Sequence, residues 1–116
     1  MTLRTRPGFE AFVMALPAVT MVEQWEALVA KVGGKVFALA GDGGGISFKV
    51  SEIAFVGLTS IPGIEQAPYF ARGSWVRVAP EAEFSDDHLA LYLREAYRLI
   101  ARKLTRKLRA ELGLAP

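Results

Sequence analysis

The sequence contains no cysteine, and His88 is its single histidine. The lack of cysteine excludes disulfides, thiol nucleophiles, cysteine-held iron–sulfur clusters and cysteine-bound zinc. The lack of further histidines excludes a metal site built from several imidazoles. We therefore expect no metal, no cofactor and no enzymatic activity. A chain without cysteine also suits a reducing environment, so we expect a cytoplasmic protein.

Long apolar runs are missing too. No run reaches the ~20 residues that a membrane-spanning helix requires, so we expect no membrane partner. Arg4 and Arg6 precede an apolar stretch at residues 9–19, but Glu10 and Pro17 interrupt it and no small-x-small cleavage site follows. The apolar residues recur at helical spacing, at Phe9, Phe12, Val13 and Leu16. A short amphipathic helix that Pro17 ends is therefore a better interpretation than a signal peptide.

What the chain has in quantity is apolar residues, which make up 52% of its 116 residues, together with 11 glycines. Disorder requires low hydrophobicity and a high net charge, whereas the formal net charge here is only +2. The length suits one domain with a sizeable core. We expect residues 1–116 to form a single domain without internal repeats or linkers.

A tight hairpin is predicted in the first half of the chain. The strand-like runs 27–32 and 35–40 are separated only by Gly33-Gly34. Glycine favours the positive φ angles that the central residues of such a turn require. The two runs therefore form antiparallel neighbours.

A second glycine-rich stretch, residues 41–45, precedes a run at 46–50 in which apolar and polar residues alternate. That alternation indicates a half-buried strand, which completes a three-stranded meander. A phosphate-binding loop would instead end in Lys and Ser or Thr and lead into a helix. We therefore interpret these glycines as a turn.

Beyond the meander, Ser51 begins a short helix whose apolar face we assign to Ile53, Val56 and Leu58. Residues 63–74 are predicted to form an ordered loop. A fourth strand follows, with two residues on each face: Trp75 and Arg77 on one, Val76 and Val78 on the other.

The last element is predicted to be a long helix from Ser85 to Leu112. Asp86 and Asp87 lie in its first turn, where the helix dipole favours negative charge, and this explains them without a catalytic role. Because a helix of this length is long for a small domain, we expect a bend near residues 104–105.

The positive charge is concentrated at the C-terminal end. Residues 1–93 carry seven basic and ten acidic residues, whereas residues 94–116 carry seven basic and two acidic residues. At ~100° per residue, five arginines fall opposite the apolar face of the predicted helix: Arg94, Arg98, Arg102, Arg106 and Arg109. Such a stripe attracts phosphate with a steep dependence on salt. The alternative is that it is only the solvated face of a helix.

A second candidate surface lies on the predicted sheet and its loops. The basic residues between positions 7 and 93 are Lys31, Lys35, Lys49, Arg72 and Arg77. Tyr69 and Trp75 offer aromatic rings on which bases stack. Alternatively, Trp75 packs in the core and the lysines protect sheet edges against aggregation.

Five short segments carry a family resemblance: LPAV at 16–19, VGGKVFAL at 32–39, ISFKV at 46–50, APYFARGSWVRV at 67–78 and AYRLI at 96–100. In their order and spacing they resemble the MmcQ/YjbR family of small bacterial proteins, and the resemblance covers about residues 7–111. The chain departs from the family pattern at residues 23–29. The resemblance implies a CyaY-like (frataxin-like) α+β fold and the DNA-binding label that the family carries.

We therefore predict a two-layer α+β protein, with helices packed on one face of an antiparallel sheet, that is not an enzyme. It is expected to bind double-stranded DNA weakly, mainly through phosphate and without base-specific contacts. The expected contact residues are Lys35, Lys49, Arg72, Trp75, Arg77, Arg98, Arg102 and Arg106.

Two alternatives remain open at this point. The first is a protein-interaction module, with homodimer formation and no nucleic-acid role, that uses an apolar patch. That patch would be drawn from Phe55, Leu58, Ile61, Ile64 and Phe70. The second is a small-ligand pocket near Tyr69, Trp75 and Arg77.

Overall fold

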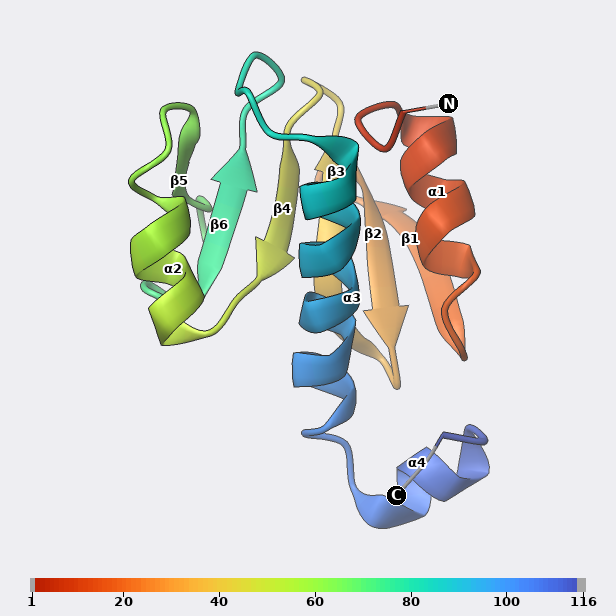
Figure 1. Cartoon of the computed structure of the whole chain (residues 1–116). Helices are drawn as coiled ribbons and strands as arrows, with labels where there is room; N and C mark the ends of the chain where they lie inside the picture. Colours follow the sequence, from red (N-terminus) through yellow and green to blue (C-terminus); the bar gives the residue numbers. More distant parts are fainter. Residues whose placement is uncertain (1, 115–116) are drawn as a thin grey trace.

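The centre of the protein is a six-stranded antiparallel sheet, seen in a computed structural model that describes residues 2–114. In chain order the elements are α1 (Arg6–Met14), β1 (Val19–Gln24), β2 (Ala27–Val32), β3 (Lys35–Gly41), β4 (Ile46–Lys49), α2 (Glu52–Leu58), β5 (Ile64–Gln66), β6 (Trp75–Val78), α3 (Asp86–Ala101) and α4 (Arg106–Glu111). The strand order is β1-β2-β3-β4-β6-β5. Helices α1, α2 and α3 lie on one face of this sheet (Figure 1), which confirms the predicted α+β fold.

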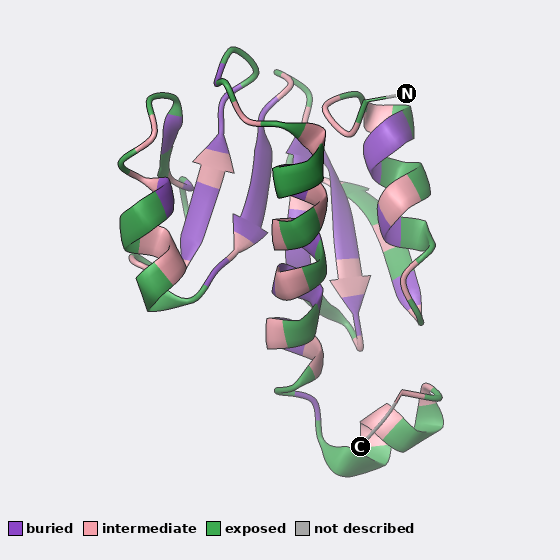
Figure 2. Ribbon diagram, in the orientation of Figure 1, coloured by how far each residue is buried: buried purple, intermediate pink, exposed green. Residues whose placement is uncertain are grey.

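The hydrophobic core lies between the sheet and its helices. Phe9 of α1 and Leu89 of α3 are fully buried, and they belong to the same cluster as Phe37 and Phe48 of the sheet. Figure 2 shows the buried residues concentrated in the central strands and on the inner sides of α1 and α3. Within residues 2–114, Figure 1 shows no helix packed on the opposite face of the sheet.

Each helix begins after a hydroxyl residue whose side chain accepts a hydrogen bond from a backbone N–H. These residues are Thr5, Ser51, Ser85 and Thr105. A cap of this kind contributes about 1 kcal/mol. The helix starts predicted at Ser51 and Ser85 are confirmed.

Arg4 fixes the connection between β6 and α3. Its guanidinium donates hydrogen bonds to the carbonyl oxygens of Ala79, Pro80, Ala82 and Phe84, at 3.1, 3.0, 2.9 and 2.8 Å. The planar fork of five N–H donors in arginine suits several acceptors at once. A connection without regular structure is thereby held in one conformation by the N-terminal segment.

Two strands were not expected from the sequence. Strand β1 pairs with β2 through a turn at Trp25 and Glu26, whose φ angles are 56° and 55°. This turn escapes prediction because neither residue is among the glycine, asparagine and aspartate that favour positive φ. Strand β5 lies inside the predicted loop 63–74, and its three residues are too few to show a pattern.

The predicted apolar face of α2 is wrong for two of its three residues. Ile53 is 88% exposed and Val56 is 71% exposed, whereas Leu58 is buried. Ala54 and Phe55 pack against the core instead. A helix of seven residues gives too short a window for its buried face to be assigned from spacing alone.

The predicted helix from Ser85 to Leu112 is interrupted, as the expected bend indicated. Helix α3 ends at Ala101, and Thr105 caps the start of α4, which extends beyond the sheet in Figure 1. Leu104 between them is buried. The single arginine stripe is therefore wrong, since Arg106 and the residues after it lie on a different helix axis.

Candidate functional site

Basic side chains converge where α3 passes the end of the sheet. Lys49 ends β4, and its pKa lies below the usual value of lysine, mainly because of partial burial and further because of the neighbouring ammonium group of Lys103. The turn at Gly33 packs against Leu104, because a Cβ on Gly33 would lie 2.6 Å from its Cδ1. This contact brings the start of β3, with Lys35, to the same end of the molecule.

We call this group the basic end, and it consists of Lys35, Lys49, Arg102, Lys103 and Arg106. Within residues 2–114 the ion pairs are Arg6–Glu23, Arg6–Asp42 and Arg98–Glu95, so no carboxylate neutralises a member of the basic end. Arg102, Lys103 and Arg106 are exposed. An uncompensated group of this kind is suited to bind phosphate or another oxyanion.

Sequence reasoning placed Arg98 with this group, and the structure gives it a local partner. Its Nη1 lies 3.0 Å from Oε2 of Glu95, three residues earlier on α3. Its neighbour Arg94 lies over the ring of Phe12, at 4.9 Å from the ring centroid. Both arginines are thus partly occupied by contacts within the chain.

The other predicted contact residues lie elsewhere. Trp75 and Arg77 belong to the helix-free face of the sheet, and Arg72 is exposed in the loop before β6. Trp75 is only 6% exposed, because the ring of Phe70 stacks on it with 4.0 Å between centroids. Base stacking on Trp75 would therefore require Phe70 to move.

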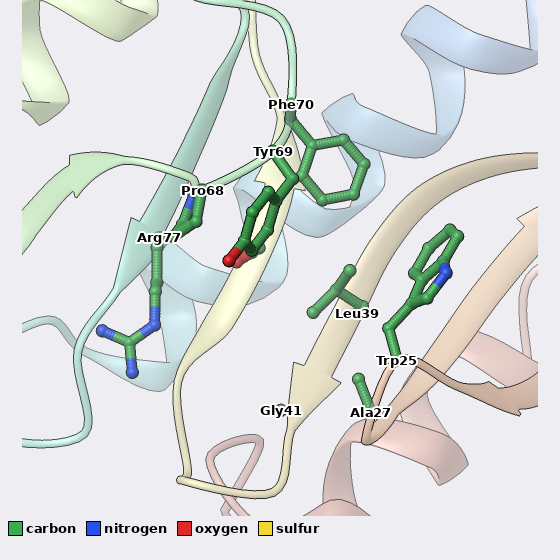
Figure 3. Close-up of a pocket in the computed structure, with 9 residues that line it drawn as sticks. Trp25, Ala27, Leu39, Gly41, Pro68, Tyr69, Phe70 and Arg77 are labelled. Atoms are coloured by element: carbon green, nitrogen blue, oxygen red, sulfur yellow. The ribbon is translucent and has the colours of Figure 1, made fainter.

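The helix-free face contains a cavity of about 540 Å³, which we call the aromatic cavity (Figure 3). Its lining residues are Trp25, Ala27, Leu39, Gly41, Ser47, Pro68, Tyr69, Phe70 and Arg77. Small residues from β2, β3 and β4 form its floor. Figure 3 shows Trp25 on one side of this floor and Tyr69 with Arg77 on the other.

Two of the aromatic lining residues have an unfavourable backbone conformation. The φ angles of Trp25 and Tyr69 are 56° and 69°. A left-handed conformation at a residue other than glycine costs on the order of 1 kcal/mol or more. Both side chains are nevertheless exposed, at 64% for Trp25 and 105% for Tyr69, so packing in the core does not explain the cost.

The loop that carries Tyr69 is held by Gln66. Its Nε2 donates to the carbonyl oxygens of Ala67, Phe70 and Ala71, and its Oε1 accepts a hydrogen bond from the backbone N–H of Gly73. These hydrogen bonds hold the loop in one conformation. Tyr69 and Phe70, which line the aromatic cavity, are therefore positioned by contacts within the chain.

Sequence reasoning placed a small-ligand pocket near Tyr69, Trp75 and Arg77, which locates the cavity approximately. It missed Trp25 and Ser47, because their turn and strand register were not recognisable from local pattern. Within residues 2–114 no group of three or more Asp, Glu or His side chains is placed to hold a metal ion. No helix among these residues is long and apolar enough to cross a membrane.

The chain is similar in sequence and in fold to known proteins. A family model described as YjbR matches residues 14–99. A Deinococcus radiodurans protein with a DUF419 domain has a similar crystal structure, with a TM-score of 0.86 and 26% identity over 96% of this chain and 89% of that chain. A Pseudomonas syringae protein is similar in fold alone, with a TM-score of 0.68 and 17% identity over 82% of this chain and 97% of that chain. No curated protein matches the chain.

Proposed function

This chain belongs to the YjbR family, and from that premise we propose that it binds double-stranded DNA weakly through phosphate contacts at the basic end. The proposal keeps Lys35, Lys49, Arg102 and Arg106 of the contact residues predicted from the sequence, and it adds Lys103, which the structure places beside Lys49. It includes no catalytic step and no metal.

The observation that carries the proposal is the placement of Lys49 beside Lys103. The ammonium group of Lys103 helps to lower the pKa of Lys49, because two neighbouring positive charges repel one another. A phosphate between them would replace this repulsion by two attractions. No carboxylate among the described residues performs that role.

The same arrangement argues against base-specific recognition. Helix α4 has six residues, which is short for a helix that reads the major groove. Lysine and arginine on an exposed end bind phosphate readily, and phosphate contacts carry no sequence information. We expect dissociation constants of about 10⁻⁶ to 10⁻⁴ M, as for non-specific DNA binding.

The salt dependence tests the number of contacts. If about four phosphates are neutralised, the logarithm of the binding constant falls with the logarithm of salt concentration with a slope of about −4. Fluorescence anisotropy of a labelled 20-base-pair duplex, measured at several salt concentrations, provides this slope. Binding without salt dependence would contradict phosphate contact.

A matched pair of variants tests the location. Lys49→Gln with Lys103→Gln removes two charges from the basic end, and Lys31→Gln with Arg72→Gln removes two charges elsewhere. We expect the first variant to weaken binding at least tenfold and to reduce the slope by about 2. Equal losses in both variants would show that only net charge matters, and the basic end would no longer be the site.

A second candidate function rests on the exposed residues of α2. Two members of the apolar patch expected from the sequence, Leu58 and Ile64, are buried. The residues of α2 that are open to solvent are instead Ile53 and Val56, which the sequence pattern assigns to its buried face. Exposed apolar side chains next to one another are typical of a protein-binding surface. If the chain forms a homodimer through α2, light scattering will give a mass that rises with concentration, and Ile53→Ser with Val56→Ser will keep it monomeric.

A further inference from the structure

We propose that the aromatic cavity binds a small planar aromatic acid, with its ring between the aromatic side chains and its anionic group on Arg77 and Ser47. The ligand class is an aromatic ring that carries a carboxylate or a phosphate group. This site is separate from the basic end and does not depend on the proposed DNA binding.

The ring position follows from the walls of the cavity. Phe70 stacks on the buried ring of Trp75, at an interplanar angle of 17°, and is therefore fixed before a ligand arrives. Trp25 approaches Phe70 edge-on, with centroids 6.5 Å apart. Planar rings bind well in such surroundings, because stacked and edge-on contacts between aromatic rings are both favourable.

The floor of the cavity leaves space for that ring. Ala27 and Gly41 are cross-strand partners, and so are Leu39 and Ser47. Three of these four residues have small side chains or none, on a sheet face that no helix covers. The resulting volume of about 540 Å³ lies within the usual range of small-molecule sites.

The anionic group is assigned to Arg77 and Ser47. These two residues are direct cross-strand partners on β6 and β4, so their side chains share one face of the sheet. Ser47 is the single buried polar residue of residues 2–114, and its hydroxyl makes no hydrogen bond to those residues. A serine hydroxyl in this position can donate a hydrogen bond to an oxyanion.

Arg77 is available for such a contact. Its cross-strand partner Glu65 does not form an ion pair with it, and no described residue accepts a hydrogen bond from its guanidinium. The guanidinium lies over Gly45, where a Cβ would come within 2.6 Å of its Nε. Glycine at this position therefore keeps room for the arginine, whose planar fork binds carboxylate or phosphate through two N–H groups.

The strained residues support a binding role for the same place. Trp25 and Tyr69 hold left-handed backbones and present exposed rings at the cavity. Strain of this kind is concentrated at functional sites. Two such aromatic residues at one cavity are explained if each ring covers part of a ligand.

A small acid fits this lining better than a nucleic acid strand. Arg77 is the single charged residue among the lining residues that the structure describes. One guanidinium matches one anionic group, whereas a strand requires a series of cations along its backbone. We therefore assign the cavity to a separate small molecule.

The experiment compares an aromatic acid with its neutral amide. Chemical shifts of ¹⁵N-labelled protein are followed while 2-naphthoate or 2-naphthamide is added, with adenosine monophosphate as a third ligand. We expect saturable shifts at Trp25, Phe70 and Arg77, and naphthoate to bind at least tenfold more tightly than naphthamide. Competition between naphthoate and adenosine monophosphate would show that the cavity accepts a phosphate group, and binding of naphthoate alone would restrict the ligand class to carboxylates.

Variants assign the contacts. Arg77→Gln is expected to weaken naphthoate at least tenfold and to leave naphthamide unchanged, whereas Arg72→Gln, an arginine outside the cavity, changes neither. Trp25→Ala is expected to weaken both ligands, and Trp25→Phe to restore most of the affinity if the alanine variant folds poorly. None of the cavity variants should change the affinity for duplex DNA at the basic end.

Three results would overturn the proposal. The first is equal affinity for acid and amide, since Arg77 would then have no role. The second is a set of shifts confined to residues outside the cavity. The third is a concentration-dependent mass that Trp25→Ala abolishes, because a second copy of the chain would then occupy the cavity.

Discussion

The two turns that flank β2 share a left-handed backbone but contain very different residues. Gly33 and Gly34 have φ angles of 59° and 81°, and Trp25 and Glu26 have φ angles of 56° and 55°. At the Gly33-Gly34 turn glycine is required, because Leu104 occupies the space of a side chain on Gly33. At the Trp25-Glu26 turn the backbone is strained, and the ring of Trp25 is exposed to solvent.

The two turns lie at opposite ends of β2 and have different roles. At the basic end the local sequence agrees with the fold, and the turn serves as a packing surface for the segment after α3. At the aromatic cavity the local sequence disagrees with the fold, because Trp25 and Glu26 are not residues that favour a positive φ. The strained turn places the side chain of Trp25 beside the cavity. Disagreement between local preference and structure is common at functional sites.

The largest expected effect comes from Gly33→Ala. A left-handed alanine and a contact with Leu104 at well under 3 Å both oppose the folded state, and together they should lower the free energy of unfolding by about 3 kcal/mol. Urea denaturation followed by circular dichroism measures this loss. Gly34→Ala is the matched control, since open space surrounds it and only about 1 kcal/mol of backbone strain is expected.

Tyr97→Phe tests a hydrogen bond between α3 and the segment that follows α1. The Tyr97 hydroxyl donates a hydrogen bond to the carbonyl oxygen of Pro17 at 2.6 Å, and its loss should cost about 1 kcal/mol. Burial raises the pKa of Tyr97 above its usual 10.0, so the folded state holds this proton more strongly than the unfolded chain. The stabilisation is therefore full below pH 10 and disappears as the pH rises through the raised pKa.

Urea denaturation at pH 7, 9 and 11 measures this contribution. The stability difference between the wild type and Tyr97→Phe should be constant at the two lower values and smaller at pH 11. Tyr92→Phe is the control, because the Tyr92 hydroxyl makes no hydrogen bond to the described residues. A difference that grows with pH would contradict the assigned role of the hydroxyl.

Glu26→Gly should remove part of the strain at the other turn. Glycine adopts a φ of 55° without steric cost, although it also makes the unfolded chain more flexible, so a net gain of about 0.5 kcal/mol is expected. Thermal denaturation measures the gain. Loss of stability in this variant would show that the glutamate side chain, and not the backbone, determines the turn.

The smallest effect is expected for Lys103→Gln. Removing this ammonium group should raise the pKa of Lys49 toward its usual 10.5, although burial keeps it lower. Because the folded state binds the Lys49 proton more weakly than the unfolded chain, stability increases as the pH rises between the lowered pKa and 10.5. NMR titration of the lysine side chains measures this change in pKa. If the pKa of Lys49 is the same in Lys103→Gln as in the wild type, the two ammonium groups do not interact.

The fold was largely predictable because its signals are local. Gly33 and Gly34 between two apolar runs specify a hairpin, and Ser51 and Ser85 specify helix starts. Strand β1 was not predictable, since its turn contains Trp25 and Glu26 in place of glycine. The buried face of α2 depends on contacts with β6, which spacing within seven residues does not reveal.

The candidate sites were predictable only as residue types. Lys49 and Lys103 are neighbours, and Lys35 lies at the same end of the molecule, because α3 packs along β3 and β4. This is a relation between distant segments. Ser47 and Arg77 meet because β4 pairs with β6 and not with β5, and this pairing has no local signature. The sequence therefore indicates that basic and aromatic residues form the candidate sites, but it does not show which of them belong to the basic end and which to the aromatic cavity.

The contacts of Arg4 have a consequence for the order of events during synthesis. Its four acceptors lie 75–80 residues further along the chain. A ribosome that adds about 5–20 residues per second takes several seconds to deliver them. Until residues 79–84 have been made, the Arg4 guanidinium lacks its four acceptors, so these hydrogen bonds form late relative to the synthesis of Arg4.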